Sequence, residues 1–274
     1  MPNTQSSDRC IATSSDAAYF SAVMALLRSL KRTNPDIPII VFDGGLSRTQ
    51  IKKASRFAKV LPKRPFSDIK IRGKFDYITS TTLLKFEVAG LPFDSVLYLD
   101  ADTVVLGDLS GAFLIPEGHV GGVPEVNTLR NMFRLQHRDM LEKTIDINWA
   151  GRGINMGFFV IRPDEWKDLR ERANKLIERF GREIFSKTAD QQLLSIIFNG
   201  KIHILPQKYN FSPFYDNMDD CDPLVIHYLG RCKPWHFKYP SGYNYREFRE
   251  NLSVWDRPMI IVTDLLRRIS GKTG

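Results

Sequence analysis

Ser95-Val96-Leu97-Tyr98-Leu99-Asp100-Ala101-Asp102-Thr103 is an apolar run that ends in two carboxylates two positions apart. The apolar part predicts a buried strand. In an extended chain, side chains two positions apart point to the same face with Cα atoms about 6–7 Å apart, so both carboxylates can approach one cation. Buried carboxylates this close repel each other unless a proton, a basic partner or a divalent metal relieves the repulsion. The nearest Lys or Arg upstream is Lys85. The stretch therefore predicts a metal site at the end of a central strand.

Length and composition fit a soluble globular protein. A chain of 274 residues buries about 75% of its unfolded surface, which suits one large α/β domain or one domain with a tail. The net charge of +8 and the pI of 9.4 favour anionic partners. The basic residues are dispersed and form no nucleic-acid motif, so we expect a nucleotide or an anionic membrane surface and no nucleic acid.

The cysteines and the apolar runs bear on location. Three cysteines without a C-x-x-C spacing argue against a disulfide framework and against a zinc ribbon. The N-terminus has no apolar run of secretory length, and no window reaches the ~18–20 apolar residues of a membrane span. The default expectation is a cytoplasmic protein, and its oligomeric state is left open.

Periodicity predicts alternating strands and helices, which is typical of a mainly parallel sheet. The expected strands are residues 9–13, 37–42, 95–99, 119–124, 154–161, 201–205 and 224–227, with a short apolar edge after Asp102. The expected helices are 19–32, one capped by Ser47 that runs to 57, 81–90, 127–143, 163–180 and 189–198. Residues 14–16 read as a turn or cap, and 62–75 as a loop.

The last residues differ in character from the rest. Tyr, Phe and Trp side chains alternate with Arg and Lys, and 259–269 reads as a helix. We therefore divide the chain into a domain over 1–240 and a helical tail over 241–274. The tail either lies on a membrane surface as a peripheral contact or docks on the domain.

A second stretch, Ile226-His227-Tyr228-Leu229-Gly230-Arg231-Cys232-Lys233-Pro234-Trp235, follows a short strand. Its imidazole, flexible glycine, lysine and tryptophan suit a metal-bound diphosphate. Adding a nitrogen ligand to oxygen ligands moves the preference from Mg²⁺ toward Mn²⁺, and Lys233 supplies a point charge for phosphate.

Four landmarks occur in a familiar order: Asp100-Ala101-Asp102, Asn155-Met156-Gly157, Asp190-Gln191, and H-x-x-G-x-x-K-P-W from His227 to Trp235. With them the chain resembles the retaining glycosyltransferases of family eight, the glycogenin-like and bacterial lipooligosaccharide galactosyltransferase group, over about residues 9–238. The resemblance implies a single catalytic domain of GT-A type, an α/β fold with a Rossmann-like, mainly parallel central sheet flanked by helices.

The resemblance also implies the reaction. A hexose, glucose or galactose, moves from a UDP-sugar to a hydroxyl of a glycan, lipid-linked or protein acceptor with retention of configuration. It implies that Asp100, Asp102 and His227 hold Mn²⁺, with Mg²⁺ as the alternative, against the diphosphate. The other residues implied to bind the nucleotide-sugar are Thr13, Ser15, Asp16 and Tyr19 for the uridine, Lys85 for the donor sugar or phosphate, Ala101 between the metal ligands, Asn155 and Asp190 for sugar hydroxyls, Gln191 beneath the anomeric carbon, and Gly230 and Lys233 for the diphosphate.

Two departures from the family pattern lie on the sugar side. Many bacterial members read D-Q-D where this chain has Asp190-Gln191-Gln192, and Met156 replaces the usual small residue. Both bear on the identity of the donor more than on the reaction. Tyr215 lies in the loop comparable to the one in which glycogenin glucosylates its own tyrosine.

Asp190 and Gln191 are the expected catalytic residues. Retention normally calls for a nucleophile below the anomeric carbon, but an amide is a poor one. We expect the carbonyl oxygen of Gln191 to stabilise an oxocarbenium-like centre while the acceptor attacks from the side of the leaving group and a phosphate oxygen takes the proton.

Two other classes of protein stay open. Asp100-Ala101-Asp102-Thr103-Val104 also fits the D-x-D-x-[TV] pattern of haloacid-dehalogenase-like phosphatases, in which the first Asp is a nucleophile. That interpretation leaves His227–Trp235 without a role. The second of these classes is a non-catalytic nucleotide-sugar-binding protein.

Overall fold

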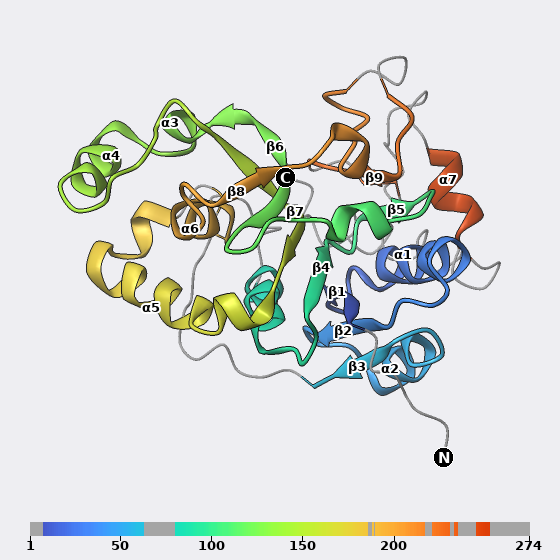
Figure 1. Cartoon of the computed structure of the whole chain (residues 1–274). Coiled ribbons are helices and arrows are strands. Elements are labelled where there is room, and N and C mark those ends of the chain that lie inside the picture. The colour runs from blue at the N-terminus through green and yellow to red at the C-terminus, as the bar shows by residue number, and fades with distance from the viewer. Residues whose placement is uncertain are drawn as a thin grey trace, which may run out of the picture.

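A seven-stranded sheet organises the protein in a computed structural model that describes residues 8–62, 80–185, 188, 190–216, 221–230, 233–234 and 245–252 (Figure 1). Its strands are β1 (Arg9–Ser15), β2 (Ile39–Asp43), β3 (Lys59–Leu61), β4 (Ser95–Leu99), β6 (Val120–Thr128), β7 (Arg152–Ile161) and β8 (Ile202–Ile204). Their order is β3-β2-β1-β4-β7-β6-β8. Strand β7 is antiparallel to both β4 and β6, and every other pair is parallel. The predicted mainly parallel α/β sheet is confirmed.

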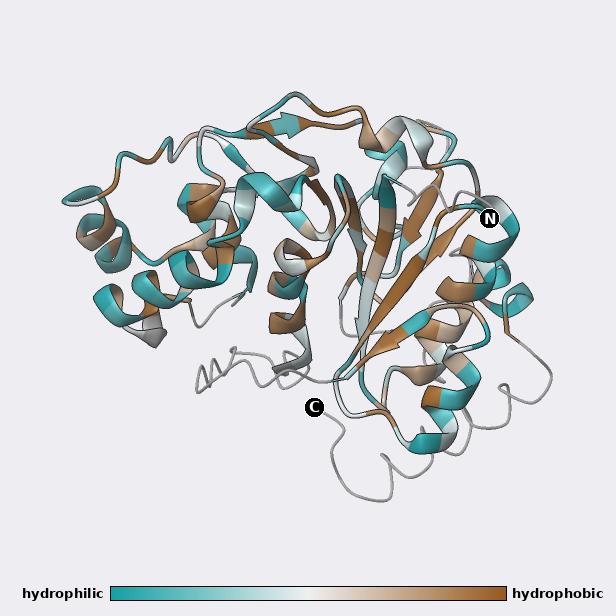
Figure 2. Ribbon diagram, turned by 60° about the horizontal axis from the view of Figure 1, so that its bottom comes forward, coloured by the Kyte–Doolittle hydropathy of each residue, from teal (hydrophilic) through white to brown (hydrophobic). Residues whose placement is uncertain are grey.

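Helices cover both faces of the sheet, which explains why the central strands are apolar throughout rather than alternating. In β4, Val96 and Tyr98 pack with one core cluster while Leu97 and Leu99 pack with the other. Figure 1 shows α1 (Phe20–Thr33) and α2 (Arg48–Ala54) on one side and α5 (Leu169–Phe180) and α6 (Asp190–Ile197) on the other. Figure 2 shows apolar strands between helices whose outer faces are polar.

A small second sheet brings the C-terminal part of the chain back to the centre. Strand β5 (Thr103–Val105) follows β4 after the turn at residues 100–102 and pairs antiparallel with β9 (Val225–His227). In this register Thr103 lies opposite His227, and the amide of Tyr228 donates to the carbonyl of Asp102 at 3.0 Å. The pairing therefore sets His227 beside the two acids that end β4.

The strand order places a crevice at the ends of β1 and β4. From β1 the chain continues through α1 to β2 and then β3 on one side of the sheet. It then returns through the 3₁₀ helix η1 (Ser80–Gly90) to β4 on the other side of β1, so the strand order reverses between β1 and β4. Ligands of open α/β sheets bind beyond the carboxyl ends of the strands at such a reversal of strand order.

Several predicted boundaries were wrong for local reasons. Residues 14 and 15 continue β1 instead of turning, because they still pair with β2. The predicted helix 163–180 breaks after η3 (Pro163–Trp166), and α5 begins at Leu169, so that both Trp166 and Leu169 are buried. Residues 81–90 form a 3₁₀ helix and not an α-helix.

The polar segment 127–143 also differs from the single helix predicted. Its first residues end β6, and two short helices follow, α3 (Leu129–Met132) and α4 (Leu135–Glu142). They are separated by extended Phe133, which buries its ring edge-on against Trp149. Strand β3 and helix α7 (Tyr245–Glu250) were missed because three and six residues carry little periodic signal.

The described part of the tail packs on the domain. Phe248 of α7 meets Tyr228 edge-to-face at 5.8 Å, and Arg32 of α1 donates to the side chain of Asn251 at 3.0 Å. No described helix has the length and apolar character needed to cross a membrane. The predicted helix 259–269, Trp235, Cys232 and all of the predicted loop beyond Pro62 lie outside the described residues; Cys10 and Cys221 are free thiols.

Candidate functional site

A pocket of about 220 Å³ opens at the carboxyl ends of β1 and β4. It gathers thirteen of the fourteen residues predicted from the sequence: Ser15, Asp16, Tyr19, Lys85, Asp100, Ala101, Asp102, Asn155, Asp190, Gln191, His227, Gly230 and Lys233. Thr13 is the exception. Its side chain is fully buried one residue before the pocket wall, and the neighbouring Ser14 lines the pocket and bonds to the Tyr98 hydroxyl at 2.7 Å.

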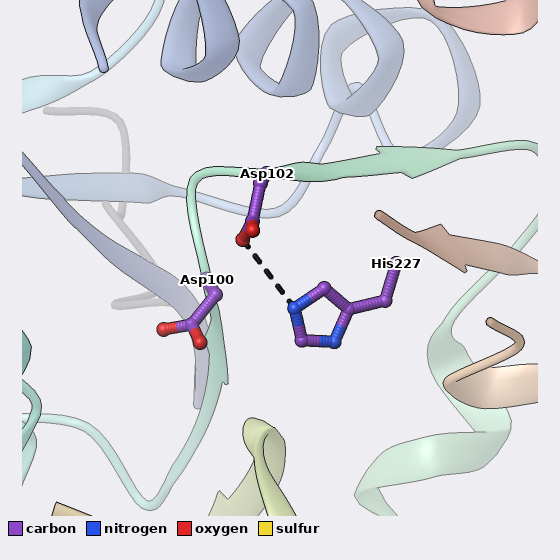
Figure 3. Close-up of side chains that lie close together, drawn as sticks. All are labelled: Asp100, Asp102 and His227. Atoms are coloured by element: carbon purple, nitrogen blue, oxygen red, sulfur yellow. Dashed lines mark ion pairs between the residues drawn. The ribbon is translucent and has the colours of Figure 1, made fainter. Parts of the chain in front are cut away.

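Asp100, Asp102 and His227 form what we call the carboxylate–imidazole cluster. One potential ligand atom from each lies within 4.8 Å of the others, and His227 Nε2 is 3.3 Å from Asp102 Oδ1 (Figure 3). The two acids lie close together for a different reason from the one predicted. Residues 100–102 are not extended but form the turn between β4 and β5. The β5–β9 pairing then adds the ring.

Neighbouring groups fix the orientation of the imidazole. Asn210 Oδ1 lies 2.9 Å from His227 Nδ1 and can accept a hydrogen bond from it, which holds Nε2 on the side of Asp102. Such an outer partner is typical of metal-binding histidines. Two carboxylates and an oriented imidazole are a donor set that suits a divalent cation.

Gly157 allows the close approach. Its backbone oxygen accepts from the Asp100 amide at 2.8 Å. A Cβ at this position would collide with the His227 ring and lie 2.9 Å from the Asp100 carboxylate. A glycine is therefore required where β7 passes the cluster. Gly230 has φ of +86°, a conformation that glycine adopts without strain.

Two buried lysines balance the acids. Lys233 Nζ donates to Asp102 Oδ2 at 2.5 Å and to the Tyr228 carbonyl at 2.8 Å. Burial alone would raise the pKa of Asp102, but Lys233 and then His227 outweigh it and hold that pKa far below its usual range.

Lys85 joins two acids from different elements. Its Nζ lies 3.3 Å from Asp100, 2.5 Å from Asp190 and 3.1 Å from the Met156 carbonyl. Burial would lower the pKa of Lys85, yet the charges of Asp100 and Asp190 hold it above its usual range. Burial raises the pKa of Asp190, and Lys85 opposes that rise. Because two carboxylates and a carbonyl surround its ammonium group, Lys85 acts here as a counter-charge; contact with a donor sugar stays a prediction.

Asn155 and Gln191, which line the pocket, and Glu125 behind them form what we call the amide cluster. Glu125 Oε2 accepts from Asn155 Nδ2 at 3.0 Å and from Gln191 Nε2 at 2.8 Å. Asn155 Oδ1 in turn accepts from the Gly157 amide at 3.0 Å. Hydrogen bonds thus connect the amide cluster to the strand that supports the carboxylate–imidazole cluster.

A polar turn closes the pocket at the end of β1. Asp16 Oδ1 accepts from the amides of Ala18 and Tyr19 at 3.0 and 3.1 Å, and its Oδ2 lies 3.4 Å from the Thr81 hydroxyl. The turn leaves Ser15, Asp16 and Tyr19 on the pocket wall, as the sequence predicted.

Sequence reasoning missed several residues here. Ser14, Thr81, Thr82 and Thr188 also line the pocket. So do Met156, which the sequence placed on the sugar side, and Gly157 and Leu229, which it quoted only as parts of the landmarks. Ser14 was predicted in a turn, and the strand period starting from buried Cys10 and Ala12 would have put it on their face. Glu125 gave no signal beyond being an acid that directly follows the predicted strand 119–124.

Comparison with known proteins agrees with this geometry. A sequence model described as "Glycosyl transferase family 8" matches residues 10–238. The chain belongs to this family. The match contains both strand-end acids, the amide cluster and His227, so the family-8 region includes the whole pocket wall.

Individual glycosyltransferases and their solved structures are similar to this chain. It is 29% identical over 187 residues to a "Lipopolysaccharide 1,2-glucosyltransferase" of Escherichia coli (strain K12), covering 63% of this chain and 54% of that protein. It is 23% identical over 261 residues to "Glycosyltransferase GlyE" of Streptococcus pneumoniae serotype 4 (strain ATCC BAA-334 / TIGR4), covering 86% and 58%. The chain thus spans about half the length of the curated relatives it matches.

A crystal structure of the galactosyltransferase LgtC in complex with donor and acceptor sugar analogs superposes with a TM-score of 0.72 at 19% identity, covering 88% of this chain and 94% of that one. A crystal structure of GlyE gives 0.65 at 20% identity, covering 92% and 62%. The fold is therefore of GT-A type, as predicted.

Proposed function

We propose that this chain is a retaining glycosyltransferase that moves a hexose from a UDP-sugar to a hydroxyl of a glycan acceptor with the aid of a divalent cation, Mn²⁺ being expected. The observation that carries the proposal is one pocket that holds a carboxylate–imidazole cluster, a buried lysine and a wall of amides. These groups are the ones needed to bind a nucleoside diphosphate and to stabilise it as the leaving group.

The charges of the pocket favour a cation together with a diphosphate. Asp100, Asp102 and Asp190 bring three negative charges, and Lys85 and Lys233 bring two positive ones. Asp100, Asp102 and His227 would hold the cation, and a bound cation would supply neutralisation of charge on a departing diphosphate. Lys233, at the same edge and next to Gly230, would bind a phosphate oxygen once it exchanges its bond to Asp102.

The amide wall suits the sugar. Asp190 is ion-paired with Lys85, and Glu125 already accepts from two amides. Neither carboxylate is therefore presented as a nucleophile beneath the sugar, which favours a stabilising role for Gln191. Asn155 and Asp190 would meet sugar hydroxyls, and Ser15, Asp16 and Tyr19 the uridine. Of the two departures from the family pattern, Met156 lines the pocket, whereas the side chain of Gln192 is buried outside it and donates to the carbonyls of Met132 and Ile184.

The names of the relatives guide the donor and acceptor. The E. coli relative is a lipopolysaccharide glucosyltransferase, and LgtC is a galactosyltransferase solved with donor and acceptor analogs. We propose glucose or galactose as the donor sugar and a lipid-linked or other envelope glycan as the acceptor. The proposed arrangement is a catalytic domain over 1–240 with a tail over 241–274, acting in the cytoplasm; α7 packing on α1 supports the docked alternative for residues 245–252.

The alternatives explain less. A phosphatase would use Asp100 as a nucleophile and would leave the oriented His227 unexplained, and this chain belongs to a glycosyltransferase family. A non-catalytic binding protein would not need the carbonyl oxygen of Gln191 in the pocket.

The test is release of UDP. The purified chain is incubated with UDP-glucose, UDP-galactose or their N-acetyl forms, with Mn²⁺, Mg²⁺ or EDTA, and free UDP and free sugar are measured. We expect slow, cation-dependent hydrolysis of one hexose donor. Binding without hydrolysis or transfer would favour the binding protein, and turnover of a simple phosphomonoester would favour the phosphatase.

A further inference from the structure

Glu125 is the one member of the amide cluster that does not line the pocket. It lies half-buried in β6 behind Asn155 and Gln191. The β6–β7 register shifts on both sides of Pro124, between Gly122 and Pro124 and again before Thr128. A bulge of this kind re-aims side chains, and here it turns Glu125 toward the two amides.

The chemistry of a carboxylate decides how the amides face. An ionised carboxylate only accepts hydrogen bonds, so each amide must present its NH₂ end to Glu125. The NH₂ of Gln191 lies at 2.8 Å and that of Asn155 at 3.0 Å from the same oxygen. The carbonyl end of Gln191 therefore points away from Glu125, and Gln191 itself lines the pocket.

Resting on the proposed function, we propose that Glu125 is a positioning residue that holds the carbonyl oxygen of Gln191 toward the reacting carbon of the donor. Without Glu125, the amide rotates freely between two orientations of opposite polarity. With it, the amide is also polarised, because a hydrogen bond from its NH₂ to an anion increases the negative charge on its oxygen. Both effects stabilise positive charge that develops at the anomeric carbon.

The same carboxylate has a second consequence in Asn155. Its NH₂ bond to Glu125 leaves Oδ1 to accept from the Gly157 amide at 3.0 Å. Gly157 lies against His227 and Asp100. Because these bonds run through the backbone of β7 and not through the ligand atoms, we expect Glu125 to affect the rate more than nucleotide or metal binding.

The first experiment is a double-mutant cycle with Glu125→Leu, Gln191→Ala and the double variant, with Glu142→Leu on the exposed face of α4 as control. We expect Glu125→Leu to lower kcat by about tenfold to a hundredfold with UDP affinity within about twofold. If Glu125 acts through Gln191, the double variant turns over no more slowly than Gln191→Ala. Multiplying effects, or a parallel loss of UDP affinity, would overturn the proposal.

A conservative variant and a spectrum separate the role of Glu125 from misfolding and from failure of the proposed function. Glu125→Gln retains an oxygen that can accept from both amides but carries no charge, so it should recover part of the rate that Glu125→Leu loses. In a ¹⁵N spectrum of the metal-free protein, the side-chain NH₂ pair of Gln191, assigned by its loss in Gln191→Ala, should shift in Glu125→Leu and stay in Glu142→Leu. This readout needs no transfer, so an inactive wild type would sink the proposed function alone, whereas an unmoved signal would sink the role of Glu125.

Discussion

The two clusters of the pocket are built in opposite ways. In the carboxylate–imidazole cluster, formal charges neutralise each other directly: Lys233 lies on Asp102 at the place where a cation would take its ligand. In the amide cluster, neutral amides are held by one carboxylate and keep their ends in a defined order. Under the proposed function, Asp102 must exchange Lys233 for the cation when the cation and the nucleotide bind. The amides of the second cluster already have the orientation that the proposal requires.

The largest effect should come from the first cluster. Asp102→Ala should lower transfer by about a thousandfold or more, because a lost ligand removes the cation that neutralises the leaving group. Transfer is measured as UDP release at saturating donor with Mn²⁺, and the melting temperature reports the fold. Asp164→Asn, whose carboxylate is 83% exposed, is the control. Near-normal cation-dependent transfer by Asp102→Ala would refute the metal assignment.

The amide cluster should respond in rate alone. Gln191→Ala should lower kcat by about a hundredfold through loss of the oxygen that faces the reacting carbon. The affinity for UDP, measured by calorimetry with Mn²⁺, should stay within about twofold of the wild type. A variant that loses UDP affinity and keeps kcat would make Gln191 a binding residue and remove the contrast between the clusters.

Exchange of partners can be tested at Lys233. Lys233→Met should bind Mn²⁺ alone about tenfold more tightly, because nothing competes for Asp102 Oδ2, and should bind UDP with Mn²⁺ about tenfold more weakly. Titrations by calorimetry or Mn²⁺ resonance give both numbers. Lys175→Met, at an exposed pair on α5, should change neither. Weaker binding of Mn²⁺ alone would mean that Lys233 does not compete with the ion.

The smallest expected effect concerns stability in acid without metal. The pKa of Asp102 is held low in the fold, so its contribution to stability is present above the unfolded pKa of about 3.9 and is lost as pH falls below it. The difference in unfolding free energy between wild type and Asp102→Asn should shrink below pH 4, by at most about 1.4 kcal/mol per pH unit. Urea unfolding at pH 3 and pH 6 measures it.

Gln191→Ala is the companion in the same urea series. It removes no ionisable group, so its difference from the wild type should be independent of pH. A pH-dependent difference in Gln191→Ala, or a constant one in Asp102→Asn, would contradict the division of the pocket into a charged and a neutral cluster.

The sequence predicted what depends on regular patterns. An apolar strand buried on both faces, such as Val96–Leu99, can be predicted without knowing which strands lie beside it. The order of the four landmarks predicted the family. The prediction that Asp100 and Asp102 share the face of an extended strand was wrong, because the chain turns at Ala101 to start β5. His227 reaches these two acids only because β5 pairs with the distant strand β9, and no local sequence pattern contains that pairing.

Glu125 shows the same limit on the other wall. Its role depends on a bulge at Pro124 and on amides from β7 and α6. Lys85 was predicted to touch the donor, yet it also links Asp100 to Asp190 across two elements. A side chain whose partners all come from other elements cannot be assigned from its own surroundings in sequence.

The antiparallel pairing of β5 with β9 has a consequence for synthesis. All seven strands of the main sheet lie before residue 205, whereas the imidazole arrives with residue 227. A nascent chain can therefore complete its large sheet while the pocket still lacks His227. Under the proposed function, chains interrupted in this interval would have the main sheet but would neither bind the cation nor turn over a nucleotide-sugar.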